Sequence, residues 1–275
     1  MKTKFTLSQI LVAAGFLCIL VALLFANKKS DKKPETAQKS ENHQHQHFDF
    51  WVLSDSINAV LDKNLQVFVK EQSVLAQNGN LTSIDTLVKI YGLNKQPILA
   101  SLWKEKRAEK TNSSKDWAET GTRFYVSSQF YPNFRNDLMD KAIHSLEKAL
   151  EIEPTNIDAK IKLGVCFVES TQEPMKGITL LREVLQVDSN NIDAHLNLGL
   201  FAIQSGQYDK AIERFNKILS INPEYIEAYI YLGQTFANKG DKKKAIEILE
   251  KYKRLNKDEL INEQVNKYIN ELKTS

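Results

Sequence analysis

Cysteine is scarce in this sequence: among 275 residues it occurs as Cys18 and Cys166. Cys18 lies in an apolar run and Cys166 lies in a predicted helix, so the sequence does not indicate a disulfide framework. The chain also has no strong excess of positive or negative charge, since its formal net charge is +3. A net charge this small does not indicate a nucleic-acid-binding protein.

Recognisable catalytic motifs are missing as well. The chain has no nucleophile elbow, no phosphate-binding glycine loop, and no HExxH or CxxC motif. His144 and His195 stand alone on predicted helices, and Cys166 is interpreted as a small core side chain. We therefore predict that the protein is not an enzyme and holds no cofactor or metal.

One long hydrophobic run is present near the amino terminus. Residues 5–27 carry no charge, and they are long enough to cross a hydrocarbon core of about 30 Å as a helix. Leu24 and Ala26 make a poor small-x-small cleavage site, so we predict an uncleaved transmembrane signal anchor. A cleaved signal peptide, which would release a periplasmic protein, is the alternative.

Lysines flank this run on both sides and bear on its orientation. Lys2 and Lys4 precede it, whereas Lys28, Lys29, Lys32 and Lys33 follow it. The positive-inside rule taken alone places the rest of the chain in the cytoplasm. A very short amino tail is instead typical of an anchor whose carboxyl side is exported. We expect a single-pass protein of the inner membrane with its carboxyl-terminal part on the periplasmic side.

A polar segment of mixed charge follows at residues 28–47. Such a composition cannot bury a core, so we predict a flexible linker. His43, His45 and His47 alternate with glutamines in this segment. Three imidazoles could collect a transition metal, but nothing here would hold a rigid coordination geometry, and we interpret them as part of the linker.

The rest of the chain contains an internal repeat. Residues 192–223 predict two antiparallel helices with a tight turn between them. Gly199, Gly206 and Ala211 have counterparts 34 residues later, at Gly233, Gly240 and Ala245. Small side chains at positions 199 and 211 allow two helix backbones to approach closely, and Pro223 ends the second helix. A period of 34 residues with this pattern resembles the tetratricopeptide repeat (TPR) family.

The resemblance implies an all-α, right-handed TPR solenoid behind the transmembrane helix. We expect a helical region over residues 48–111, a TPR array over 112–259, and a capping helix in 260–275. The array divides into units of about 112–156, 157–191, 192–225 and 226–259. In the first unit, residues 128–137 are predicted to be an insertion in the turn between its two helices.

The helical region before the array begins with a predicted amphipathic helix from Ser54 to Ala76, followed by a helix pair at 81–91 and 97–110. Two placements of the first helix are open. It could extend the solenoid by packing on residues 81–110, against Leu87 or Leu102. It could instead be a resident ligand of the repeats, with Leu61 or Leu65 against Leu196 or Leu200.

Acidic residues stand near the start of three successive first helices, at Asp158, Asp193 and Glu227. They could form a ladder for a basic ligand. We interpret them instead as carboxylates that stabilise helix amino-termini through the helix dipole. Asn156 and Asn191 are predicted amino-terminal caps for two of these helices.

In TPR proteins the first helix of each repeat lines a concave groove that holds a peptide or a partner's helix. Transferred position by position, the resemblance implies a largely apolar groove lined by Ile161, Val165, Val168, Leu196, Asn197, Leu200, Ile203, Ile230 and Gln234. A known subgroup clamps the carboxyl-terminus of chaperones, but of its clamp only Asn197 is present here. The implied function is a membrane-tethered scaffold that recruits a protein partner and no nucleic acid. The alternative is a structural or assembly component of an envelope complex.

Overall fold

The computed structural model describes residues 49–59, 61–170 and 172–274, and over these ranges all regular structure is helical, with no strand. These residues lie in one compact unit, His47–Ser275. The predicted transmembrane run at 5–27 and the linker at 28–47 lie outside the described residues. Within the described ranges no helix combines the length and the apolar character needed to span a membrane.

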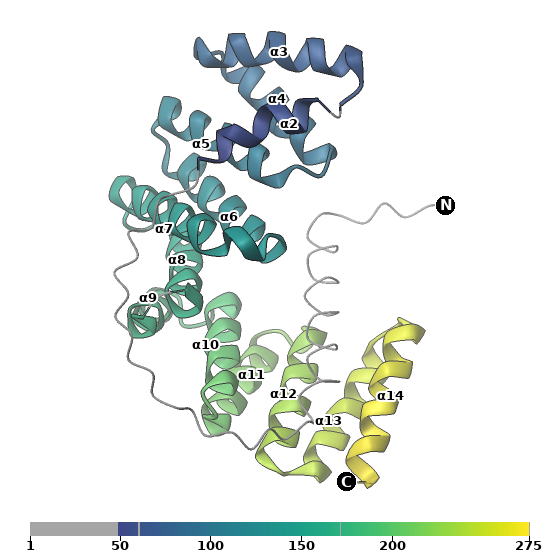
Figure 1. The fold of residues 1–275 in the computed structure, drawn as a ribbon. Helices are drawn as coiled ribbons and strands as arrows, with labels where there is room; N and C mark the ends of the chain where they lie inside the picture. The colour runs from purple at the N-terminus through teal and green to yellow at the C-terminus, as the bar shows by residue number, and fades with distance from the viewer. Residues whose placement is uncertain (1–48, 60, 171, 275) are drawn as a thin grey trace, which may run out of the picture. The chain divides into compact units, whose positions relative to one another are not determined.

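The first described helices form the amino-terminal part of this unit (Figure 1). They are the 3-10 helix η1 (Phe50–Val52) and the α-helices α2 (Leu53–Asn58), α3 (Lys63–Gln77), α4 (Leu81–Leu93) and α5 (Pro97–Thr111). The single helix predicted from Ser54 to Ala76 is wrong, because the chain breaks before Asp62 and starts a new helix. The Asp62 carboxylate accepts a hydrogen bond of 2.9 Å from the Leu65 amide, which caps α3.

Contacts of this segment decide between its two predicted placements. Leu61 and Leu65 pack against the core cluster that contains Leu87 and Leu102. Leu196 and Leu200 belong to a separate cluster in the repeats. Helix α3 packs on α4, so the segment extends the solenoid, and the resident-ligand hypothesis is wrong.

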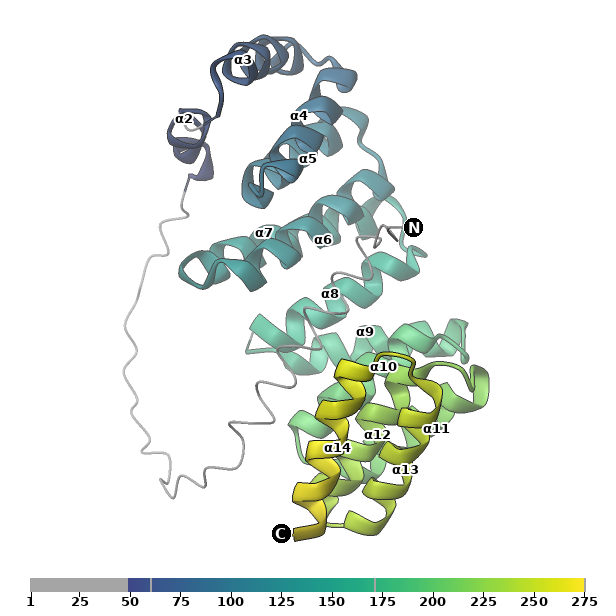
Figure 2. The same ribbon diagram turned by 90° about the vertical axis from the view of Figure 1, so that its right-hand side faces the viewer.

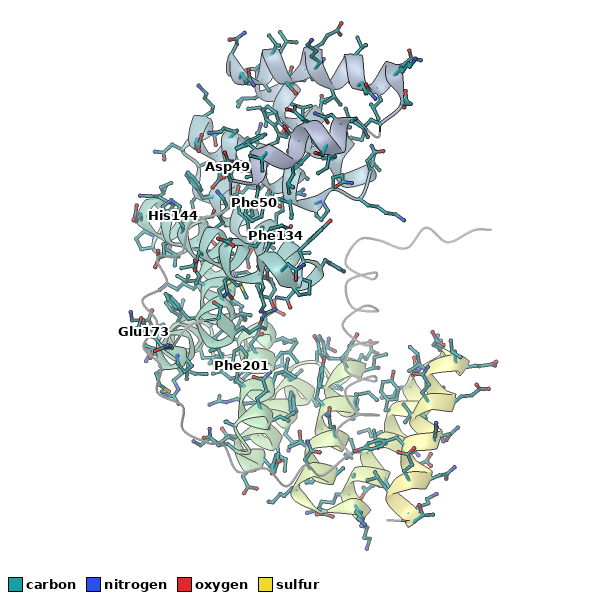
Figure 3. All side chains as sticks on the ribbon, in the orientation of Figure 1. Asp49, Phe50, Phe134, His144, Glu173 and Phe201 are labelled. Atoms are coloured by element: carbon teal, nitrogen blue, oxygen red, sulfur yellow. The ribbon has the colours of Figure 1, made fainter. Side chains whose placement is uncertain are left out.

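Aromatic side chains pack η1 against α5 and against the start of α7. The rings of Trp51 and Trp103 meet edge to face with their centroids 5.0 Å apart. Phe50 meets Phe134, near the start of α7, in the same geometry at 5.3 Å (Figure 3). Aromatic pairs at these separations favour edge-to-face packing and add to the burial of the rings.

Four helix pairs follow along the chain (Figures 1 and 2). They are α6 (Ser114–Phe130) with α7 (Arg135–Ile152), α8 (Ile157–Ser170) with α9 (Pro174–Val187), α10 (Ile192–Gln204) with α11 (Tyr208–Ile221), and α12 (Ile226–Lys239) with α13 (Lys242–Leu255). The two helices of a pair pack on each other, and the second packs on the first helix of the next pair. A last helix, α14 (Glu259–Thr274), packs on α13. This neighbour-to-neighbour packing makes the described unit a helical solenoid.

Small residues stand where the helices of a pair cross, as predicted. A Cβ atom added at Gly199 would lie 2.8 Å from the Phe215 ring, and one added at Gly233 would lie 2.8 Å from the Leu249 side chain. Ala211 is completely buried at the same crossing. The two best copies of the repeat therefore need small side chains for close packing.

The first pair departs from the predicted insertion at residues 128–137. Helices α6 and α7 have 17 and 18 residues, whereas α8 has 14. They are joined by a short 3-10 turn, η2 (Pro132–Phe134). The extra residues therefore lengthen both helices and do not form a loop. Phe134 in this turn packs edge to face against Phe50.

Candidate interaction surface

The first helices of neighbouring repeats contact one another. Helix α6 contacts α8, α8 contacts α10, and α10 contacts α12. Four helices therefore form a continuous row, and their outward side chains are the candidates for a common binding surface. The labelled Phe201 marks the position of α10 in this row (Figure 3).

The nine residues predicted to line the groove divide into two sets. The side chains of Ile161, Val165 and Ile230 are buried. The partly exposed set consists of Val168, Leu196, Asn197, Leu200, Ile203 and Gln234. A partner in the groove could contact the second set directly, whereas the first set belongs to the protein interior.

Packing between first helices explains the burial of two of these residues. Ile161 and Val165 of α8 share a core cluster with Leu198 and Phe201 of α10. They fill the space between the two helices and are 5% exposed each. The apolar surface available to a partner is therefore smaller than the repeat pattern implies, and it is concentrated on α10.

A polar cluster that the sequence reasoning missed lies at the carboxyl-terminal ends of α6 and α8. The Tyr125 hydroxyl donates to Glu169 over 3.1 Å, and the Arg135 guanidinium lies 3.4 Å from the other carboxylate oxygen. Burial raises the pKa of Tyr125, and the Glu169 carboxylate adds to the rise. The cluster joins α6, α7 and α8 through residues far apart in sequence.

The repeat register could have indicated Tyr125. It stands four residues after Gly121, as Val168 stands four after Gly164 and Ile203 four after Gly199. Because this position is predicted to face the groove in the other repeats, Tyr125 is its counterpart in the first repeat. The repeat pattern gives no such indication for Arg135, because residues 128–137 were predicted to be an insertion.

The predicted helix caps and first-turn acids are found in the structure. Asn156 and Asn191 accept hydrogen bonds of 3.0 and 2.9 Å from amides in the first turns of α8 and α10. Asp158, Asp193 and Glu227 lie in the first turns of α8, α10 and α12. Carboxylates there complement the positive end of the helix dipole.

Cys166 is buried, as its interpretation as a core side chain requires, and His195 is buried as well. Burial raises the pKa of the Cys166 thiol to about 12, so it stays protonated at neutral pH. The His195 ring lies 3.0 Å from the Ser189 carbonyl oxygen, and burial lowers its pKa. No group of three or more histidine, cysteine or acidic side chains gathers into a metal-binding arrangement in the described ranges.

Comparison with known families places repeats in the carboxyl-terminal half of the chain. The TPR domain of cytochrome c-type biogenesis protein H matches residues 133–227, and a further tetratricopeptide repeat family matches residues 202–262. No curated protein sequence matches the chain.

Solved structures similar to this chain include two of MamA and one of YrrB. One MamA structure is 24% identical, covers 63% of this chain and 90% of its own, and has a TM-score of 0.49. MamA from residue 41 onward, from Desulfovibrio magneticus RS-1, is 21% identical, with coverages of 62% and 92% and a TM-score of 0.50. YrrB, described as a TPR protein with an unusual peptide-binding site, is 20% identical, with coverages of 72% and 97% and a TM-score of 0.47.

The class of protein follows from the fold and the family matches. The described residues form an all-helical solenoid of the TPR type, with the repeat signature over residues 133–262. The MamA likeness supports the fold alone.

Proposed function

We propose that this chain is a scaffold that recruits a protein partner through the row of first helices α6, α8, α10 and α12. The observation that carries the proposal is the partly exposed apolar group on α10, formed by Leu196, Leu200 and Ile203. These side chains pack against the core cluster formed by α10, α11 and α12 and remain partly exposed. An apolar helix face or peptide side chain would cover this surface.

The polar residues of the row would orient such a partner. Gln234 on α12 is partly exposed. Asn197 on α10 is partly exposed as well, and its amide group donates to the Asp193 carbonyl oxygen over 2.8 Å. A binding surface with an apolar centre and a few placed polar groups is the usual composition of a specific protein interface.

Photo-crosslinking tests this recruitment. A photoreactive amino acid in place of Leu200 should give a discrete adduct with a partner when the full-length chain is irradiated in its native membranes. The same amino acid in place of Asn216, which is exposed on the second helix α11, should give none. Equal adduct patterns from both positions would show that the row of first helices has no special role.

A second candidate function, an assembly component built from copies of this chain, is favoured by a different observation. Helix α3 exposes the apolar side chains of Val67, Phe68, Val74 and Leu75, and an exposed apolar patch marks an interaction site. Photo-crosslinking from Phe68 on this face tests the second candidate. An adduct from Phe68 with the mass of two copies of the chain favours assembly, whereas an adduct of another mass from Leu200 favours recruitment.

We further propose that residues 5–27 tether the scaffold to the inner membrane, with the repeats on the periplasmic side. The support for the tether is the length of the uncharged apolar run. The chain should stay with the membrane during an alkaline carbonate wash. Protease added to spheroplasts should degrade the repeats, whereas intact cells should protect them. Release by carbonate would contradict the tether, and protection in spheroplasts would contradict the orientation.

A further inference from the structure

A cavity of about 160 Å³ opens among the first described helices. Its lining comes from η1, from the carboxyl-terminal end of α3, and from α4 and α5 (Figure 1). The apolar part of the lining consists of Trp51, Ala76, Ile84 and Trp103. None of these elements belongs to the row of first helices α6, α8, α10 and α12, so the cavity is separate from the surface proposed for recruitment.

The apolar walls of this cavity are part of the packed interior. Ala76 and Ile84 are buried, and the Trp103 side chain is 5% exposed. The partly exposed Trp51 packs against the same core cluster, and its ring meets the Trp103 ring edge to face. Such a contact holds both rings in place. The cavity is therefore an apolar recess that the packing of these helices leaves open.

The size of the recess limits what it can hold. An apolar cavity of about 150 Å³ accommodates a benzene molecule, whereas small-molecule sites usually measure about 300–1,000 Å³. The recess therefore has room for one apolar side chain, such as that of phenylalanine or leucine, and is too small for a drug-sized ligand. Single side chains that fill a pocket are typical anchors of protein interfaces.

Two lysines of α5 complete the lining. Lys106 and Lys110 are both exposed and both border the recess. They are four residues apart, so they lie on one face of the helix. The recess thus has an apolar interior and two cationic groups at its edge.

Both ammonium groups are available to a ligand. Lys110 takes part in none of the ion pairs found among residues 49–59, 61–170 and 172–274. Lys106 pairs with Glu109 at 2.8 Å, but the two side chains are 46% and 44% exposed, and an exposed pair is weak. The helix dipole accounts for a lysine in the last turn of α5, where Lys110 lies. It does not account for an apolar recess beside two lysines.

We propose that this recess binds a segment of a partner protein in which a phenylalanine or leucine is flanked by carboxylates. The apolar side chain would enter the recess and leave water, and the carboxylates would pair with Lys106 and Lys110. This charge complementarity selects an acidic segment over a basic one. The site goes beyond the recruitment proposed above, because it lies on other helices and does not depend on the apolar group of α10.

Titration of the full-length chain with a fluorescent pentapeptide, one phenylalanine between two pairs of glutamates, tests the site. The peptide should bind saturably, and replacing its phenylalanine with alanine should weaken binding by at least about tenfold. Combining Lys106→Ala with Lys110→Ala should weaken binding of the phenylalanine peptide about tenfold, because both cations are removed. Lys89→Ala is the matched control, since Lys89 is exposed on α4 and does not line the recess.

Tryptophan fluorescence locates the bound peptide. Two of the three tryptophans of the chain line the recess, so a peptide without tryptophan should shift the emission of the chain when it binds there. Ala76→Leu should reduce both this shift and the affinity, because the larger side chain occupies part of the recess. Melting curves matching the parent show that the variants are folded. If Ala76→Leu does not fold, the exposed lysine variants and the two peptides still decide the outcome.

Several results would overturn the site. They are the absence of saturable binding, equal affinity for the phenylalanine and alanine peptides, and an equal loss in Lys89→Ala and in the double lysine variant. Binding that leaves the tryptophan emission unchanged places the peptide elsewhere and also overturns the site. A change of emission when the chain is diluted without peptide would show that a second copy fills the recess instead. A missing adduct at Leu200 contradicts recruitment and leaves the outcome of this titration unaffected.

Discussion

Replacing Gly177 with alanine is expected to lower the melting temperature of the full-length chain by about 4–8 °C. A Cβ atom at this position of α9 would lie 2.2 Å from the carbonyl oxygen of Gly164 and 2.8 Å from the Val168 side chain. The first neighbour is backbone of α8, so it cannot rotate away, and the two helices must separate. Overpacking of this kind costs about 1–3 kcal/mol or more. For a domain of this size each kcal/mol corresponds to about 2–4 °C.

The sign of this effect is informative because alanine normally favours helices. In an exposed helix interior, replacing glycine with alanine stabilises by about 1 kcal/mol. Gly92 in α4 provides that control, since a Cβ atom added there meets nothing within 4 Å. Gly92→Ala should leave the melting temperature unchanged or raise it slightly. If both variants melt alike, the close crossing of α8 and α9 at Gly177 is wrong.

Replacing Asp116 with asparagine is expected to destabilise the chain by about 3 kcal/mol, because it breaks a buried ion-paired group. The Asp116 carboxylate lies 2.7 Å from the Lys104 ammonium and 3.2 Å from the Arg107 Nε, and it accepts a hydrogen bond of 2.7 Å from Thr111. The side chains of Lys104 and Asp116 are 9% and 11% exposed. In the variant, Lys104 would still be paired with Glu119, which lies 2.6 Å away. The expected loss of stability is therefore at the lower end of the range measured when one partner of a buried ion pair is removed.

The same carboxylate predicts a pH dependence with a definite sign. Burial acts to raise the pKa of Asp116, but hydrogen bonds from Lys104 and Thr111 and the charges of Lys104 and Arg107 hold it below its ordinary value of 3.8. A depressed pKa in the folded state stabilises the fold above pH 3.8, and that contribution is lost as the pH falls from 3.8 through the folded-state pKa. The gap in melting temperature between the parent and Asp116→Asn should therefore narrow below pH 3.8.

Asp85 supplies the matched control for this variant. It pairs with the same Arg107 at 3.0 Å, but its side chain is 55% exposed. An exposed pair contributes about 0–1 kcal/mol, so Asp85→Asn should melt close to the parent at neutral pH. An equal loss in both variants would contradict the importance of burial at Asp116.

Local sequence patterns sufficed for the repeats from residue 157 onward. The small residues Gly199 and Ala211 recur after one period, and their spacing alone places two helices at a close crossing. The asparagine caps at 156 and 191 are equally local, because each accepts from an amide three residues later. These features depend on neighbours in the chain, so the sequence was enough to predict them.

Features that depend on distant residues could not be predicted in this way. The break between α2 and α3 depends on a single cap at Asp62 inside an otherwise continuous apolar pattern. Burial of Ile161 depends on how closely α10 approaches α8. The contact of Tyr125 with Glu169 joins residues 44 apart in sequence. The composition of the candidate surface was therefore only partly accessible before the helices were placed.

The ion pairs around Arg107 also influence the order in which the helices of the solenoid unfold locally. In a linear array each helix is held by its neighbours, so fraying starts at whichever end is held least. Arg107 on α5 bridges Asp85 on α4 and Asp116 on α6, and this fastens three successive helices to one another. The two ends are held less firmly, because α3 buries only Val69 and Ala76 and α14 buries only Val265 and Ile269. Amide hydrogen exchange should therefore be fast in both α3 and α14 and slowest around α5 and α6, with protection rising from each end inward.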